Sequence, residues 1–221
     1  MIKRIALAVF LALGVLAVVS TPSYADSIGP NCGTCQGSIY TLQWALENTS
    51  GGNSTYDITY TIDTSGYNAG GLYIDSAAIK VSSSVPSATT TLDSAPGGIS
   101  NWTVVDGGIN SGGCDGSGSG FECASSGGVL GAFNHVGGTL IWVFDVTIPT
   151  GNLITSSMGA SIKARYVDAN DGKVGALVSE DITLQPGGGS PPPPPVPEPA
   201  SLMLLGSGLL ALSSKRIFRK A

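Results

Sequence analysis

Charged side chains are scarce in this chain, and positive ones are nearly missing from its middle. Asp, Glu, Lys and Arg make up 11% of the 221 residues, about half of the usual share in a soluble domain. All 15 acidic residues lie between Asp26 and Glu198, whereas that stretch holds only Lys80, Lys163, Arg165 and Lys173 as basic residues. A surface with this charge repels phosphate backbones, which excludes nucleic acid as a partner.

Residues for the common catalytic sets are also few. His135 is the single histidine, so a three-histidine metal site is excluded. The sequence also has no Gly-x-Ser-x-Gly motif, which would place a nucleophilic serine for a catalytic triad with this histidine. The glutamates of the middle, Glu47, Glu122 and Glu180, show none of the paired-acid spacing known from glycoside hydrolases. We therefore expect no enzyme and no cofactor, and a secreted hydrolase is the least favoured alternative.

The N-terminus has the order of parts of a signal peptide. Lys3 and Arg4 precede the apolar stretch 5–19, and small residues follow at the positions that signal peptidase requires. Cleavage is expected between Ala25 and Asp26. An uncleaved anchor is the alternative, but the apolar stretch is shorter than the ~20 residues of a membrane span.

The C-terminus has a second hydrophobic segment, with a spacer before it and basic residues after it. A Gly-rich stretch (185–190) leads into five consecutive prolines (191–195), which form a stiff polyproline II spacer. The apolar stretch 200–214 follows, and the chain finishes with a basic cluster at 215–220. The order predicts a short transmembrane helix that stops transfer, with its basic end on the cytoplasmic side.

Val196-Pro197-Glu198-Pro199, the apolar stretch with Leu-Leu-Gly-Ser-Gly-Leu and the basic end together resemble the PEP-CTERM sorting signal. The same kind of tail is also labelled an ice-binding protein C-terminal domain. The resemblance implies processing by exosortase, which would recognise Pro197, Glu198 and Pro199 as substrate positions. It further implies a Gram-negative bacterium that makes exopolysaccharide, and a role in biofilm.

The middle of the chain shows the alternation of β-strands and no sustained helical period. Short alternating segments are separated by turns rich in Gly, Ser, Asn and Pro. We expect strands at residues 38–46, 55–62, 72–81, 101–105, 139–148, 160–167 and 178–184. Segment 139–148 is the most apolar and is expected to be central. The predicted fold is all-β, an antiparallel β-sandwich or jelly-roll-like domain, flanked by an N-terminal signal helix and a C-terminal transmembrane sorting helix.

Alternation also predicts which side chains face the core. Ile39, Leu42 and Trp44 are the expected anchors of the first strand. In segment 160–167, Lys163 and Arg165 are expected on the side opposite to the apolar residues. Segment 55–62 places Tyr56, Ile58, Tyr60 and Ile62 on one face.

The chain thus divides into a signal peptide (1–25), a β-sandwich domain (26–184), a Gly/Pro-rich linker (185–195) and a sorting tail (196–221). The stretch 32–184 also resembles PEP-CTERM surface proteins of unknown role, on segments such as TYTIDTSGY and KARYVDANDGKVGALVSEDITL. That resemblance implies no activity.

Four cysteines, Cys32, Cys35, Cys114 and Cys123, lie in the exported part. An even number in an oxidising compartment indicates two disulfides, with three possible connectivities. We favour Cys114–Cys123, which closes a Gly/Ser-rich loop, and Cys32–Cys35. A redox Cys-x-x-Cys is disfavoured because no βαβ unit surrounds it, and a zinc site because Cys114 and Cys123 are too far apart in sequence.

Two weak binding candidates remain. Asp168 and Asp171 lie in a stretch similar to a calcium loop, but the EF-hand spacing fails and a β-turn explains it better. Trp102, beside a Gly/Pro-rich loop, is the best exposed candidate for stacking on a sugar, whereas Trp44 and Trp142 are expected in the core.

The leading hypothesis is an exported, exosortase-processed protein of the cell surface or extracellular matrix, without enzymatic activity. It would be anchored in the inner membrane as a precursor, and its partners would be signal peptidase, the secretion machinery, exosortase and exopolysaccharide. A carbohydrate- or ice-binding module is the alternative.

Mass spectrometry of the exported protein tests the N-terminal prediction. We expect a mature N-terminus at Asp26, because small residues occupy the cleavage positions before it. Recovery of an intact Met1 peptide would contradict cleavage.

Overall fold

The computed structural model describes residues 27–186, apart from 84–87, 116–117 and 155–158. The predicted signal peptide, the sorting tail and the linker after Pro186 lie outside the described residues, so the domain boundaries stay a prediction. The described part consists of β-strands and loops, with one 3-10 turn, η1 (Ile99–Asn101).

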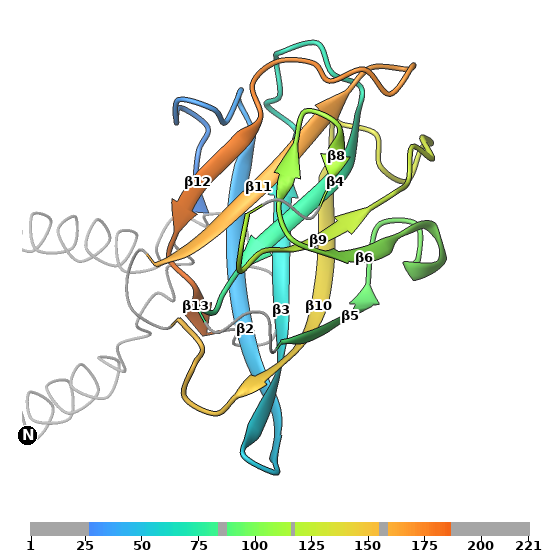
Figure 1. Cartoon of the computed structure of the whole chain (residues 1–221). Coiled ribbons are helices and arrows are strands. Elements are labelled where there is room, and N and C mark those ends of the chain that lie inside the picture. Colours follow the sequence, from blue (N-terminus) through green and yellow to red (C-terminus); the bar gives the residue numbers. More distant parts are fainter. Residues whose placement is uncertain (1–26, 84–87, 116–117, 155–158, 187–221) are drawn as a thin grey trace, which may run out of the picture. The chain divides into compact units, whose positions relative to one another are not determined.

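Two sheets make up this fold (Figure 1). Sheet A contains, in spatial order, β1 (Ser27–Ile28), β2 (Ile39–Ser50), β3 (Asn53–Asp63), β10 (Thr139–Pro149) and β5 (Thr89–Ser94), with β13 (Gln185–Pro186) also beside β2. Sheet B contains β12 (Val178–Ile182), β11 (Ala160–Val167), β4 (Tyr73–Lys80), β9 (Glu122–Ser125) and β6 (Thr103–Asp106). A hairpin of β7 (Ile109–Asn110) and β8 (Gly113–Cys114) packs on β4 and β11.

All strand pairs are antiparallel except β13 with β2. The expected all-β class with antiparallel sheets is therefore confirmed. The apolar segment 139–148 is central as predicted, because β10 lies between β3 and β5. The sequence did not predict β5 or β9, which are short and hold few large apolar residues.

Alternation along the long strands of sheet A turns one of its faces into the core. Every second residue of β3 and β10 is buried, including the four residues predicted for β3. The buried apolar residues are Tyr56, Ile58, Tyr60 and Ile62 in β3, and Leu140, Trp142, Phe144, Val146 and Ile148 in β10.

Of the three predicted anchors of the first strand, Leu42 is fully buried, and Trp44 packs against the core but is only partly buried. The third, Ile39, is wrong, because it is only half-buried whereas Tyr40 is fully buried. Successive side chains of a strand point to opposite faces, so Ile39 cannot share the face of Leu42. The tyrosine ring takes the core position.

Hydrogen bonds inside the core join the two sheets. The hydroxyl groups of Tyr40 in sheet A and Tyr166 in sheet B lie 2.8 Å apart, and Tyr166 donates to Ser38 Oγ at 2.8 Å. Tyr60 donates across the core to the carbonyl of Lys163 at 3.4 Å. The inner faces of both sheets contribute to one apolar core, so the sheets face each other.

Arg165 lies on the side of β11 opposite to Ile162, as predicted, yet it is buried. Its guanidinium pairs with Asp75 of the neighbouring strand β4 and donates to the carbonyl of Asp171 at 2.8 Å. Burial of an arginine requires such partners, because an unpaired charge away from water is costly. The hydrogen bond from Arg165 to Asp171 joins the 168–172 turn to sheet B.

Both favoured disulfides are present, Cys32–Cys35 and Cys114–Cys123, with Cα atoms 5.1 and 5.9 Å apart. Because Cys114 lies in β8 and Cys123 in β9, the second disulfide ties the β7–β8 hairpin to sheet B.

Replacing Cys114 and Cys123 together by serine should lower the free energy of unfolding by about 2–3 kcal/mol, since the closed loop is lost from the unfolded chain. Urea denaturation of the protein with its native disulfides measures the difference. As a control, the gap between wild type and variant should shrink under reducing conditions. Equal stability without reductant would contradict the structural role of this disulfide.

Candidate functional site

The sorting residues Pro197, Glu198 and Pro199 and the cleavage residues Ala25 and Asp26 lie outside the described residues. Their roles are therefore carried by the sequence alone. Between residues 27 and 186, with the gaps given above, no helix is long and apolar enough to cross a membrane.

The prediction that Trp102 is exposed is wrong. Trp102 is 6% exposed, and its Nε1 donates to the carbonyl of Pro96 at 2.9 Å. Its ring packs edge-to-face on Trp142, with centroids 5.2 Å apart. The Gly/Pro-rich loop thus supplies the hydrogen-bond partner that lets the indole enter the core, and the ring face is not free to stack on a sugar.

The two calcium candidates are engaged within the protein. Asp168 Oδ1 accepts hydrogen bonds from the backbone N–H groups of Asn170 and Gly172 at 2.8 and 2.9 Å, which is the geometry of a turn. Asp171 forms an ion pair with Arg165 at 3.4 Å. Among the described side chains, no group of three or more His, Cys, Asp or Glu could hold a metal ion.

The remaining candidates are scattered. His135 is exposed and forms an isolated β-bridge with Tyr73. The two rings pack edge-to-face, with their centroids 5.2 Å apart. Glu47 is exposed, and Glu180 is a half-buried residue of β12. All four cysteines are in disulfides, so no thiolate is available for redox or zinc chemistry in this state.

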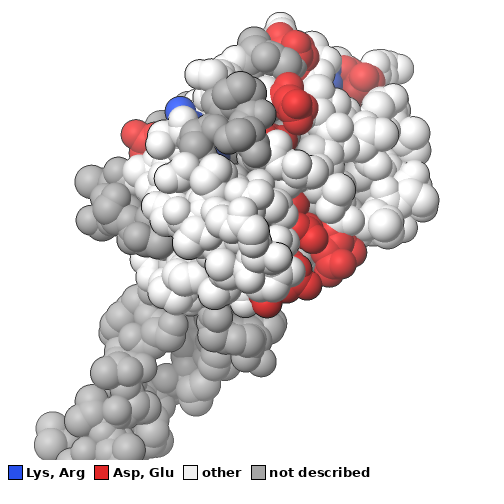
Figure 2. All heavy atoms as spheres, turned by 60° about the horizontal axis from the view of Figure 1, so that its bottom comes forward, with Lys and Arg blue, Asp and Glu red and all other residues white. Residues whose placement is uncertain are grey.

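Acidic side chains cross the outer face of sheet A in a row. Asp145 of β10 lies opposite Asp57 of β3, and burial, Asp57 and Asp93 together raise the pKa of Asp145. Figure 2 shows acidic side chains in separate groups on a mostly uncharged surface. The row accounts for part of the negative charge of the domain. Among the described residues, it does not form a group that could hold a metal ion.

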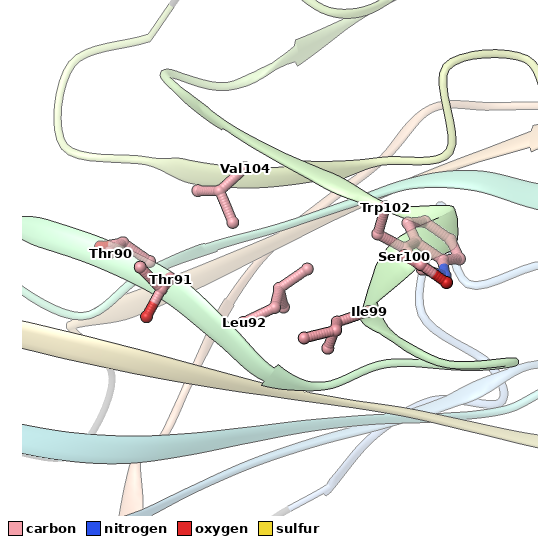
Figure 3. A pocket seen from close by; sticks show the side chains of 7 residues that line it. All are labelled: Thr90, Thr91, Leu92, Ile99, Ser100, Trp102 and Val104. Carbon is pink, nitrogen blue, oxygen red and sulfur yellow. The ribbon is translucent and has the colours of Figure 1, made fainter.

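A hollow lies where the two sheets part. β5 and β6 are the terminal strands of sheets A and B, and a cavity of about 470 Å³ opens between them. Figure 3 shows the residues that surround it. We call this cavity the edge slot, lined by Thr90, Thr91, Leu92, Ile99, Ser100, Trp102 and Val104.

The walls of the edge slot are mainly apolar. In Figure 3 the side chains of Val104, Leu92 and Ile99 project into the gap between the strands. Ile99 is 51% exposed, so the slot is open to solvent at the η1 end. Trp102 is only 6% exposed and therefore adds little surface to the slot.

A buried carboxyl group lies beside the slot. Glu122 of β9 is 3% exposed and lies opposite Asp106 of β6 in the register, with its carboxyl group close to the side chains of Asp106 and Thr90. Burial, reinforced by the neighbouring charge of Asp106, raises the pKa of Glu122 to about 7. The sequence offered one signal for this site, a glutamate between Phe121 and Cys123, but not its partners.

Comparison with known proteins identifies the C-terminus. Residues 195–220 match the family described as the PEP-CTERM protein-sorting motif, which confirms the resemblance found in the sequence. None of the curated proteins compared with this chain matches it significantly. The motif indicates an exported protein that is targeted to exosortase and passes through a membrane-anchored precursor.

The buried Glu122 predicts a pH dependence of stability. The pKa of Glu122 in the folded protein, about 7, lies above the ordinary value of 4.5. Between these two pH values, the folded protein keeps a proton on Glu122 that the unfolded chain has lost. This stabilising contribution is complete below the ordinary pKa and is lost as pH rises toward 7. Glu122→Gln should remove that slope and be the more stable form at pH 8 by on the order of 2 kcal/mol.

Urea denaturation at pH 5, 6, 7 and 8 measures the effect. Glu47→Gln is the matched control, because Glu47 is exposed, and it should keep the wild-type slope. If Glu122→Gln and wild type show the same slope, the buried carboxyl group has no raised pKa.

Proposed function

We propose that this protein is a non-enzymatic component of the surface or extracellular matrix of a Gram-negative bacterium, delivered there by exosortase and associated with exopolysaccharide. The observation that carries the proposal is the sorting motif at 195–220, placed directly after a β domain and a proline-rich spacer. The basic finish after an apolar stretch supports a membrane-anchored precursor.

The described domain supports an extracellular location. Two disulfides use all four cysteines, as is usual in oxidising compartments and rare in the cytosol. The low charge and the many Gly, Ser and Thr residues also suit an exported β-protein. We infer that the facing sheets form a sandwich of jelly-roll type, in which the loops are held by turns and disulfides rather than by helices.

The absence of enzymatic activity is part of the proposal. The one histidine is held against Tyr73 at an exposed bridge, away from any grouping that sequence or geometry marks as a catalytic set. Stacking of a sugar on Trp102 is not proposed, since that ring is buried. Any exopolysaccharide contact would use another part of the surface.

Replacing Pro197, Glu198 and Pro199 by Ala, Gln and Ala tests the sorting step. This variant keeps the apolar stretch and the basic cluster, so we expect it to enter the inner membrane and accumulate there uncut. Deletion of residues 196–221 removes the membrane stop as well, and this variant should be missing from the inner membrane. Fractionation into inner membrane, extracted exopolysaccharide and medium measures both outcomes.

Pro193→Ala is the matched control, because it changes a proline of the spacer outside the motif. It should follow the wild type into the exopolysaccharide fraction. The proposal fails if the motif variant and the deletion distribute as the wild type does. Recovery of correctly cut wild-type protein only from the medium would refute the association with exopolysaccharide and leave the sorting step intact.

A further inference from the structure

The outer face of sheet A is exposed and carries no positive charge. Along β3 and β10 its residues alternate with the buried core residues, and each of them is at least partly exposed. Ile141 of β10 is 40% exposed, although its strand lies between two others. The described strands of sheet A contain no Lys or Arg. This face therefore offers a partner threonine hydroxyl groups, an apolar side chain and carboxylates.

Three carboxylates of sheet A lie close together, and we call them the acidic row: Asp57, Asp93 and Asp145. Asp57 and Asp145 are directly opposite in the register of β3 and β10, and the charge of Asp93 also acts on Asp145. Like charges at directly opposite positions of a sheet are destabilising. Both ion pairs among the described side chains belong to Arg165, so no cation of the described chain relieves this repulsion.

Two lysines gather on the outer face of sheet B, and we call them the lysine pair: Lys80 of β4 and Lys163 of β11. Lys163 is in register with Ala78, which belongs to the outer cluster, and Lys80 is two residues further along β4. Their Nζ atoms lie 5.8 Å (Lys80) and 4.5 Å (Lys163) from the centroid of the Phe121 ring. Both lysines are partly exposed, and neither forms an ion pair with another described residue. The lysine pair therefore holds two like charges near one ring.

The acidic residue in the same row of the sheet does not neutralise the lysine pair. Asp181 of β12 is in register with Ser161 of β11, and Ser161 is in register with Lys80. Asp181 Oδ1 accepts a hydrogen bond from Ser161 Oγ at 2.7 Å. One strand thus separates Asp181 from Lys80, which corresponds to about 9–10 Å between their backbones.

The acidic row and the lysine pair lie on opposite sides of the two-sheet fold, because each is on the side of its sheet that points away from the core. One copy cannot bring its own two groups together, since the core lies between them. A contact between the acidic row of one copy and the lysine pair of the next is head-to-tail, and such contacts do not close about a two-fold axis. A series of copies can therefore extend in one direction.

We propose that the outer face of sheet A binds the outer face of sheet B of a second copy, with the acidic row against the lysine pair. Charge complementarity argues for a second copy as the partner. A small cation would relieve only the acidic row, and an anionic polysaccharide only the lysine pair, whereas a second copy relieves both. The proposal does not rest on the sorting step, because all five side chains belong to the β domain.

Sedimentation velocity of the full chain in lipid nanodiscs, with one copy in each disc, tests the proposal. We expect the wild type to form larger complexes as its concentration rises. Asp145→Lys should lower the association constant at least about tenfold, because close charge pairs at interfaces couple by that amount or more. Glu47→Lys is the matched control, with the same change of charge at an exposed position of β2 outside the acidic row, and it should associate like the wild type.

Mixing two charge-reversed variants separates this contact from general charge repulsion. One variant carries Lys80→Glu and Lys163→Glu, and the other carries Asp57→Lys and Asp145→Lys. Each should remain monomeric alone, and an equimolar mixture should associate, because the mixture restores opposite charges at the contact. General repulsion predicts instead that the second variant, which has the lower net negative charge, associates more than the wild type. Urea denaturation checks that both variants are folded, and Lys163→Gln, which should also weaken association, replaces a variant that is not.

A monomeric wild type, unchanged association of folded Asp145→Lys, or a mixture of folded variants that stays monomeric would overturn the proposal. The same holds if a monomeric wild type binds extracted exopolysaccharide through Lys80 and Lys163, since the lysine pair would then serve an anionic polymer. None of these results affects the sorting step, which the variant of Pro197, Glu198 and Pro199 tests separately.

Discussion

The pairing of β2, β3 and β10 is the constraint on which the rest of the structure depends. The register of these strands places every second residue of β3 and β10 in the core, and a shift by one residue would turn each of them outward. Sheet B packs on the face so created through Tyr40, Tyr166 and Ser38. Those polar contacts are satisfied only in this register, so the hydrogen bonds and the apolar packing select the same arrangement.

The same pairing leaves one side of the fold open. β5 and β6 end their sheets without a strand that joins them, and their inward residues are therefore only partly covered. Trp102 fills much of this side and gains a hydrogen bond from the loop beside it. Glu122 is buried on this side of the fold, close to Thr90 of β5 and Asp106 of β6.

Strands could be predicted from the sequence where polar and apolar residues alternate over many positions. Segments such as 55–62 and 139–148 alternate over many residues, and their strands and inward faces could be predicted from sequence. β5 and β9 could not, since TTTLDS and ECAS have few large apolar residues and become strands through their neighbours. The Asp75–Arg165 pair and the approach of Glu122 to Thr90 join residues far apart in sequence, which no local pattern records. The sorting motif could be identified from sequence alone, because it is defined by the order of neighbouring residues along the chain.

Both described ends of the chain lie along the same margin of sheet A. β1 pairs with Tyr40 and Thr41, and β13 pairs with Gln43 and Trp44. The backbone groups of β2 at these positions are thus occupied by the chain itself. An unprotected margin would recruit strands from adjacent copies, the usual route to fibrous aggregation. These four positions of the margin are thereby closed to strands of adjacent copies.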